Sequence, residues 1–159
     1  MRAQALLLGV VCLFVGVVGV VAQGNSDPNC GTWRLNLEKS KFDPGPAAQS
    51  QTVTISILDG VERYSSEGVD ARGMGSSTSF SAKIGGGDTG ALGLLYGDTI
   101  AVTQSSPGHL VGVIKKNGKV TITAHGDVAA DGKTRTVTYS GKTADGKEIK
   151  DKLVYDKVM

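Results

Sequence analysis

Apolar and polar residues alternate along most of the chain after its first thirty positions. A period of two places the apolar side chains on one face of a half-buried strand, whereas no window shows the period of a helix over three turns. We therefore expect an all-β protein. The inward positions that the alternation predicts are Trp33, Leu35 and Leu37; Val53, Ile55 and Ile57; Phe80, Ala82 and Ile84; Val120, Ile122 and Ala124; Val137 and Tyr139; and Ile149, Leu153 and Tyr155.

Turn-forming residues separate these segments at regular intervals. Asp-Gly and Asn-Gly pairs favour tight hairpins, because their central residues tolerate positive φ, and proline breaks a strand. These signals are Asp59-Gly60, Asn117-Gly118, Asp131-Gly132, Asp145-Gly146 and the loop Pro44-Gly45-Pro46. Their spacing predicts about eight to nine short strands. Because only closure removes both edges of such a sheet, we expect an antiparallel up-and-down β-barrel.

The first 22 residues have the composition of an export signal. Arg2 precedes an apolar run from Ala5 to Val21, and small residues end at Ala22. We expect cleavage near Ala22, a polar spacer at 23–30, and a single domain over 31–159. An uncleaved membrane anchor is the alternative reading of the apolar run. The predicted localisation is secreted or periplasmic, with no membrane attachment after cleavage.

The composition of the predicted mature chain narrows its partners. Without Arg2 it carries 16 basic and 15 acidic residues, so it has no charge excess that would attract nucleic acid or an anionic membrane. Cys30 is its single cysteine, which excludes an internal disulfide. Nothing in the sequence calls for a cofactor, and the oligomeric state is left open.

Two charged residues fall at inward positions of the last two strands. The alternation that turns Val137 and Tyr139 inward also turns Arg135 inward, and Asp151 shares a face with Leu153. They either lie at a strand end and a sheet edge, or form a buried pair that orients a polar group of a ligand. With Phe80, Tyr139 and Tyr155 they make up the candidate ligand-binding residues. Aromatic residues are only 5% of the chain, so an aliphatic interior favours a small hydrophobic ligand.

Other motifs support a function less well. The run Gly85 to Gly90 has the spacing Gly-x-Gly-x-x-Gly, but no helix can follow it, so we interpret Gly85 to Gly97 as a loop over the barrel mouth. His125 and Asp127 could join a serine in a hydrolase, yet no nucleophile turn is present. With His109 as the only other histidine, the spacing provides no metal site.

The start and the end of the predicted barrel resemble those of a known group. Gly31-Thr32-Trp33 is similar to the first strand of calycins, which include lipocalins and fatty-acid-binding proteins, and Leu153 to Val158 resembles the end of fatty-acid-binding proteins. Trp33 to Ser50 resembles small secreted bacterial proteins regarded as lipocalin-like. The resemblance implies that Gly31 and Trp33 plug one barrel end, with a basic residue of the last strands across the indole. Leu153 stands where fatty-acid-binding proteins have a carboxylate-binding arginine.

These observations favour an exported, non-catalytic barrel that binds a small apolar ligand. One alternative is a structural or interaction protein of the cell envelope with a filled barrel. Another is a hydrolase-type enzyme that uses His125 or Asp151.

Overall fold

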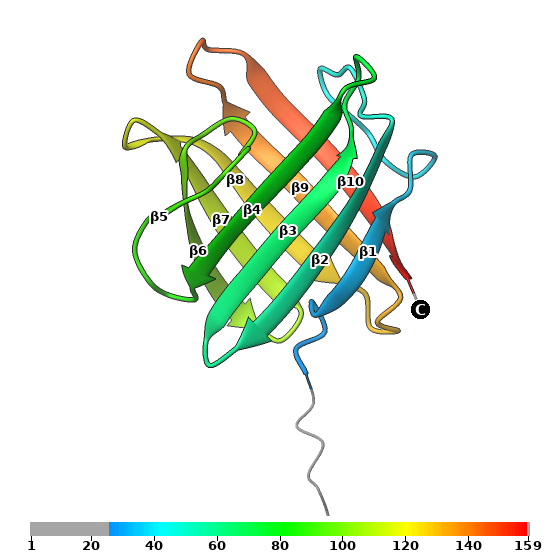
Figure 1. The fold of residues 1–159 in the computed structure, drawn as a ribbon, viewed down its shortest axis with the longest axis vertical. Coiled ribbons are helices and arrows are strands. Elements are labelled where there is room, and N and C mark those ends of the chain that lie inside the picture. Colours follow the sequence, from blue (N-terminus) through cyan, green and yellow to red (C-terminus); the bar gives the residue numbers. More distant parts are fainter. Residues whose placement is uncertain (1–25, 159) are drawn as a thin grey trace, which may run out of the picture.

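The computed structural model describes residues 26–158, which form ten antiparallel strands and no helix (Figure 1). The predicted signal peptide and its cleavage site lie outside the described residues. The strands are β1 (Gly31–Leu35), β2 (Ser50–Leu58), β3 (Val61–Val69), β4 (Gly75–Lys83), β5 (Thr89–Gly90), β6 (Thr99–Ser106), β7 (His109–Lys116), β8 (Lys119–Val128), β9 (Thr134–Lys142) and β10 (Glu148–Val158).

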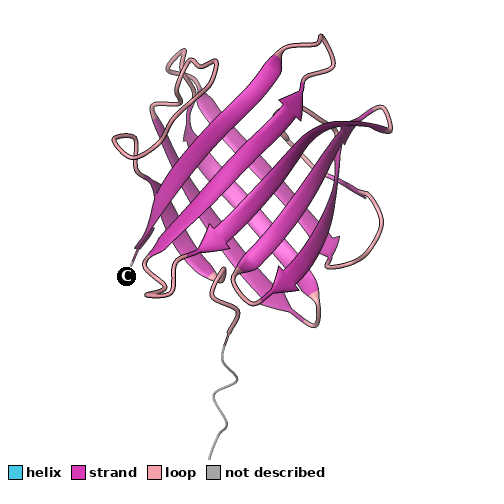
Figure 2. Cartoon of the chain, turned by 180° about the vertical axis from the view of Figure 1, so that it is seen from behind, coloured by secondary structure: helices cyan, strands magenta, loops and turns pink. Residues whose placement is uncertain are grey.

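The strands form one sheet in the order β4-β3-β2-β1-β10-β9-β8-β7-β6-β5. The first strand pairs with the last, with Trp33 opposite Lys157, and all other pairs are consecutive in sequence. The sheet curls into a barrel that is visible from both sides (Figure 2). The predicted all-β up-and-down barrel is confirmed. The structure has one strand more than the predicted maximum of nine, and the shortest of the ten is the two-residue β5 within the glycine-rich segment.

The barrel is nearly closed by the segment 85–97, which runs along the seam between β4 and β6. Ser79 and Leu92 exchange two backbone hydrogen bonds of 3.0 and 2.9 Å, and the Gly85 amide donates to the Val102 carbonyl at 2.8 Å. The segment that we expected over the mouth therefore runs along the side of the barrel, where Ala91 packs against the core and residues 93–96 line the cavity.

Two of the predicted inward residues point outward. Val120 is 60% exposed, because the β7–β8 register shifts between Ile114 and Lys115 and turns the start of β8 over. Thr121 is buried in its place, and its hydroxyl donates to the carbonyls of Tyr96 and Ile114. The inward prediction for Val120 was wrong, because nothing in the alternation marks a bulge.

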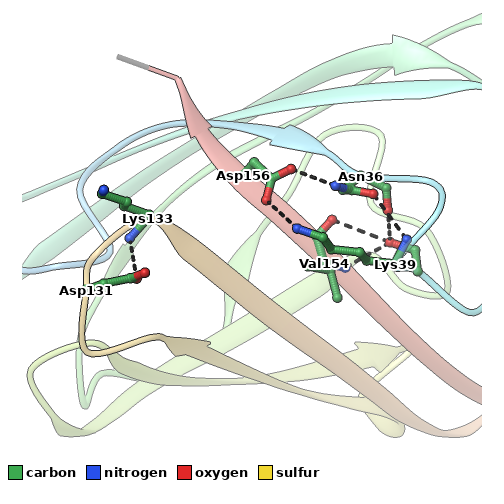
Figure 3. Close-up of polar contacts among 7 residues, drawn as sticks. Asn36, Lys39, Asp131, Lys133, Val154 and Asp156 are labelled. Carbon is green, nitrogen blue, oxygen red and sulfur yellow. Dashed lines mark hydrogen bonds and ion pairs between the residues drawn. The ribbon is translucent and has the colours of Figure 1, made fainter.

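Leu37 is the second exception and is 44% exposed. β1 ends at Leu35, and Leu37 lies in an exposed turn, closed by the Ser40 amide on the Leu37 carbonyl, after which the chain pairs with β10 again through Lys41 and Lys152. Figure 3 shows how this turn is held: the Asn36 amide donates to Asp156 at 2.6 Å, and Lys39 lies 3.5 Å from the same carboxylate. The Asn36 hydrogen bond, followed by the nearby Lys39 charge, holds the pKa of Asp156 below its usual value.

The interior holds two groups of buried apolar residues. The first surrounds Trp33 and Tyr155 near the barrel end where the described chain begins, and the second is formed mainly by β6, β7 and β8, with one residue each from β4 and β10. The members of the first are Trp33, Leu35, Val53, Ile55, Val137, Leu153 and Tyr155, and those of the second are Ala82, Ile100, Val102, Leu110, Ile114, Ile122 and Ile149.

Candidate functional site

The barrel encloses a cavity of about 490 Å³ that opens between the loops opposite Trp33. Pro44, Arg72 and Lys147, from three different loops, line its mouth. Most of its wall is apolar, with Ile100, Val102, Leu110, Ile114 and Leu94 among the lining residues. A cavity of this size and composition suits a small organic molecule, since ligand pockets commonly measure about 300 to 1,000 Å³.

Trp33 closes the opposite end of the barrel. Its side chain is fully buried, and the indole Nε1 donates to the Asn29 carbonyl at 2.8 Å. The Lys157 ammonium lies 4.8 Å from the centre of the ring, a cation–π contact from the last strand. A side chain at Gly31 would place its Cβ 2.9 Å from the Lys157 Cε, so glycine leaves the room that this contact needs. Residues of the predicted spacer, Asn29 above all, thus belong to the barrel end.

Arg135 lies inside the barrel above this plug and is 6% exposed. Its Nε donates to Asn29 Oδ1 at 3.2 Å, and the Asn29 amide donates in turn to Asp27 at 2.9 Å. A Cβ at Gly126 would come within 2.5 Å of the Arg135 Nη2, so this glycine makes room for the guanidinium. Across the described residues, Arg135 forms no ion pair, and it is one of the residues that line the cavity.

Glu62 is the second charged group at the closed end. It is 3% exposed and borders the cavity from β3, next to Ala82 of β4 and Ile57 of β2. Desolvation raises the pKa of its carboxyl to about 7, against the lowering effect of the Arg135 charge and with a smaller raising effect of Asp27. Near neutral pH the Glu62 carboxyl is therefore partly protonated, and it only partly neutralises Arg135.

Aromatic residues surround the middle of the cavity. Tyr64 and Phe80 stack with ring centres 4.8 Å apart, and both line the cavity, as does Tyr139. Burial raises the pKa of Tyr139, so its phenol stays neutral. Tyr155 is buried beside the cavity, where its hydroxyl donates to the Gln51 side chain at 2.7 Å.

Asp151 stands near the open end, where its buried carboxylate borders the cavity. Oδ1 accepts the Asp43 backbone amide at 2.7 Å, and Oδ2 accepts the Tyr96 hydroxyl at 3.5 Å. Desolvation raises the pKa of Asp151 above its usual value even though both hydrogen bonds act to lower it. The same burial, with the Asp151 charge beside it, raises the pKa of Tyr96 to about 12.

The structure brings most of the predicted site residues to one cavity but does not pair the two charges. Arg135, Tyr139, Asp151 and Phe80 line the cavity, and Tyr155 packs next to it. Arg135 lies opposite Tyr155 in the β9–β10 register, whereas Asp151 lies opposite Tyr139, four residues away along the strand. Of the two readings of these charges, the buried Arg135–Asp151 pair is not formed, because the β9–β10 register places the two groups toward opposite ends of the cavity.

Of the residues named for the hydrolase hypothesis, Asp151 lines the cavity, whereas His125 and Asp127 lie outside it. His125 is exposed on the outer face of β8. Asp127 contacts His109 instead, with 2.6 Å between its Oδ1 and the His109 Nδ1. Over residues 26–158, no group of three or more His, Cys, Asp or Glu side chains could hold a metal ion.

Sequence reasoning missed Glu62 and Asn29. Glu62 could have been found, because it shares the face of Tyr64 and Ser66 within β3 and stands across the hairpin from Ile57. Asn29 precedes the first strand and falls outside every alternating pattern. Only the folded chain shows that it bridges Trp33 and Arg135.

No protein-family model, curated protein or solved structure matches this chain. The resemblance to calycins therefore stays a prediction from the residues that carry it. In the described part of the chain, no helix is long and apolar enough to cross a membrane.

Proposed function

We propose that the chain is an exported, non-catalytic binding protein whose barrel holds one elongated small molecule. The molecule has an apolar body and an anionic, carboxylate-like head at Arg135. The observation that carries this proposal is a buried guanidinium that borders a 490 Å³ cavity without an ion-pair partner among the described residues.

The energetics of a buried charge support an anionic head. A guanidinium removed from water is costly unless a partner compensates it. Asn29 satisfies only the Nε, and Glu62 is partly protonated at neutral pH. A ligand carboxylate could accept two parallel hydrogen bonds from the Nη groups, which is the strongest form of such pairing.

The apolar lining supports a hydrophobic body. Side chains of β6, β7 and the segment 85–97 cover the wall between the two ends of the cavity. A methylene chain of the ligand would be buried against this wall along its whole length. The cavity itself favours a binding role over a filled barrel with a structural role. The position of His125 on the outer face offers no support for the hydrolase alternative.

Titration calorimetry with undecanoate and undecanol, after removal of co-purified small molecules, tests this proposal. The carboxylate should bind more tightly than the alcohol. Arg135→Gln should lower the affinity for undecanoate by about thirtyfold, which corresponds to the loss of one hydrogen bond to a charged group. Arg63→Gln is the matched control, since Arg63 lies next to Glu62 but on the exposed outer face of β3. Equal binding of undecanoate to the Arg135→Gln variant and to the unchanged protein would refute the proposed role of Arg135.

A further inference from the structure

The cavity has a charged group toward each end. Arg135 and Asp151 are separated by four residues along the paired strands β9 and β10, which corresponds to about 13 Å at 3.3 Å per residue. Val137 and Leu153, which face each other in the register between them, are both buried and apolar. The wall therefore presents a cation near the plug, an apolar middle, and a carboxylate near the mouth.

Asp151 has no cationic partner within the described residues. Its two hydrogen-bond donors, the Asp43 amide and the Tyr96 hydroxyl, are neutral, and the second is long at 3.5 Å. Lys147 lines the same mouth, but its ammonium lies 3.5 Å from the Gly45 carbonyl and forms no ion pair with Asp151. Arg72, also at the mouth, is bound by Asp70 at 2.9 Å. The Asp151 carboxylate thus has free acceptor capacity on the cavity side.

The surroundings of Asp151 favour a cation there. Asp43, the neighbour that donates its amide, carries a carboxylate whose charge raises the pKa of Asp151, and the Lys147 charge acts in the opposite direction without forming an ion pair. Asp43 is already paired with Lys41 at 3.4 Å, so a positively charged donor on the ligand would compensate Asp151, which has no ion pair of its own among the described residues. A buried carboxylate recovers its desolvation cost through such pairing.

We infer that the ligand class is a linear molecule with an anionic group at one end, an ammonium group at the other, and an apolar chain between them. This inference rests on the proposed function, because the anionic end is the one assigned to Arg135. Asp151 would then select among carboxylates that Arg135 alone would not distinguish.

A comparison of 11-aminoundecanoate with undecanoate, by titration calorimetry on the whole protein, tests this inference. The amino compound should bind about tenfold more tightly, as one charge-assisted hydrogen bond provides. Asp151→Asn keeps the shape of the side chain and should bring the ratio of the two affinities down to about one. Glu148→Gln, on the exposed side of the same strand, should change neither affinity. The shorter 6-aminohexanoate should gain nothing over hexanoate, because its ammonium cannot reach Asp151 from Arg135.

The outcomes separate this inference from the proposed function. If undecanoate binding depends on Arg135 but 11-aminoundecanoate binds equally or more weakly, the role of Asp151 is overturned and the proposed binding function stands. Absence of binding by both undecanoate and 11-aminoundecanoate would overturn both proposals. An amino-group advantage that survives in Asp151→Asn would also overturn the assignment, since it would place the ammonium elsewhere.

Discussion

Arg135 and Glu62 are charged residues placed where a barrel would ordinarily bury apolar side chains. Each borders the cavity, and each belongs to the closed end, beside the buried plug of Trp33 and Asn29. Buried charge without a close partner lowers stability, so this arrangement is retained at a cost to the fold. Such a cost is typical of residues that serve a site rather than the core.

The pH dependence of stability should reveal Glu62. Its pKa is about 7 in the folded chain and 4.5 as an ordinary glutamate, so the folded state binds the proton more tightly. The Glu62 contribution to the free energy of unfolding therefore falls as pH rises from about 4.5 to about 7, and stays low above that. Urea unfolding at pH 5 and pH 8 measures this effect. At pH 8, the free energy of unfolding of Glu62→Gln should exceed that of the unchanged protein by up to about 3 kcal/mol.

Glu67→Gln is the control for that measurement, because Glu67 lies on the exposed side of the same strand. It should leave the difference between pH 5 and pH 8 as it is in the unchanged protein. A Glu62→Gln variant with the pH profile of the unchanged protein would show that Glu62 is solvated in the fold.

At the scale of elements, the seam between β4 and β6 is the weakest part of the barrel wall. All neighbouring strands elsewhere share a ladder of hydrogen bonds, whereas the seam is joined through Ser79–Leu92, Gly85–Val102 and the two-residue β5. Gly93 makes this junction possible. It has a φ of 62°, and a Cβ at this position would collide with the backbone carbonyl oxygen of Ser77 in β4.

Replacement of Gly93 should loosen the seam without unfolding the barrel. Gly93→Ala adds a Cβ that the β4 backbone cannot accommodate, so the segment 85–97 should move away from β4. Hydrogen–deuterium exchange should then accelerate at the amides of Ser79 and Leu92, while β8 to β10 remain protected. Gly87→Ala, which meets no atom within 4 Å, should leave exchange at both amides unchanged. Unchanged exchange in Gly93→Ala would contradict the seam described above.

At the scale of the whole molecule, local patterns predict the barrel because each strand depends on its own alternation and each hairpin on its own turn. The turns at Asp59-Gly60 and Asn117-Gly118 show this, since all four residues have the positive φ that their sequence favours. Val120 and Leu37 escaped prediction because a bulge and an early turn depend on neighbouring strands. The period of two correctly placed Arg135 and Asp151 inside the barrel. It does not give the pairing register of β9 and β10, which separates the two residues by four positions along the strands.

The same distinction limits the prediction of the site. Asn29 joins Trp33 to Arg135 at the barrel end. Asn29 and Arg135 are 106 positions apart in the sequence. No pattern within one segment can contain that contact. The cavity likewise depends on side chains that eight strands and several loops contribute together.

A crystal structure of the protein with undecanoate tests the central claim most directly. We expect one molecule inside the barrel, with its carboxylate about 2.7 to 2.9 Å from the Arg135 Nη groups and its chain directed along the apolar wall toward Asp151. An empty cavity at saturating ligand, or a carboxylate held at the mouth by Lys147 or Arg72 instead of Arg135, would contradict it.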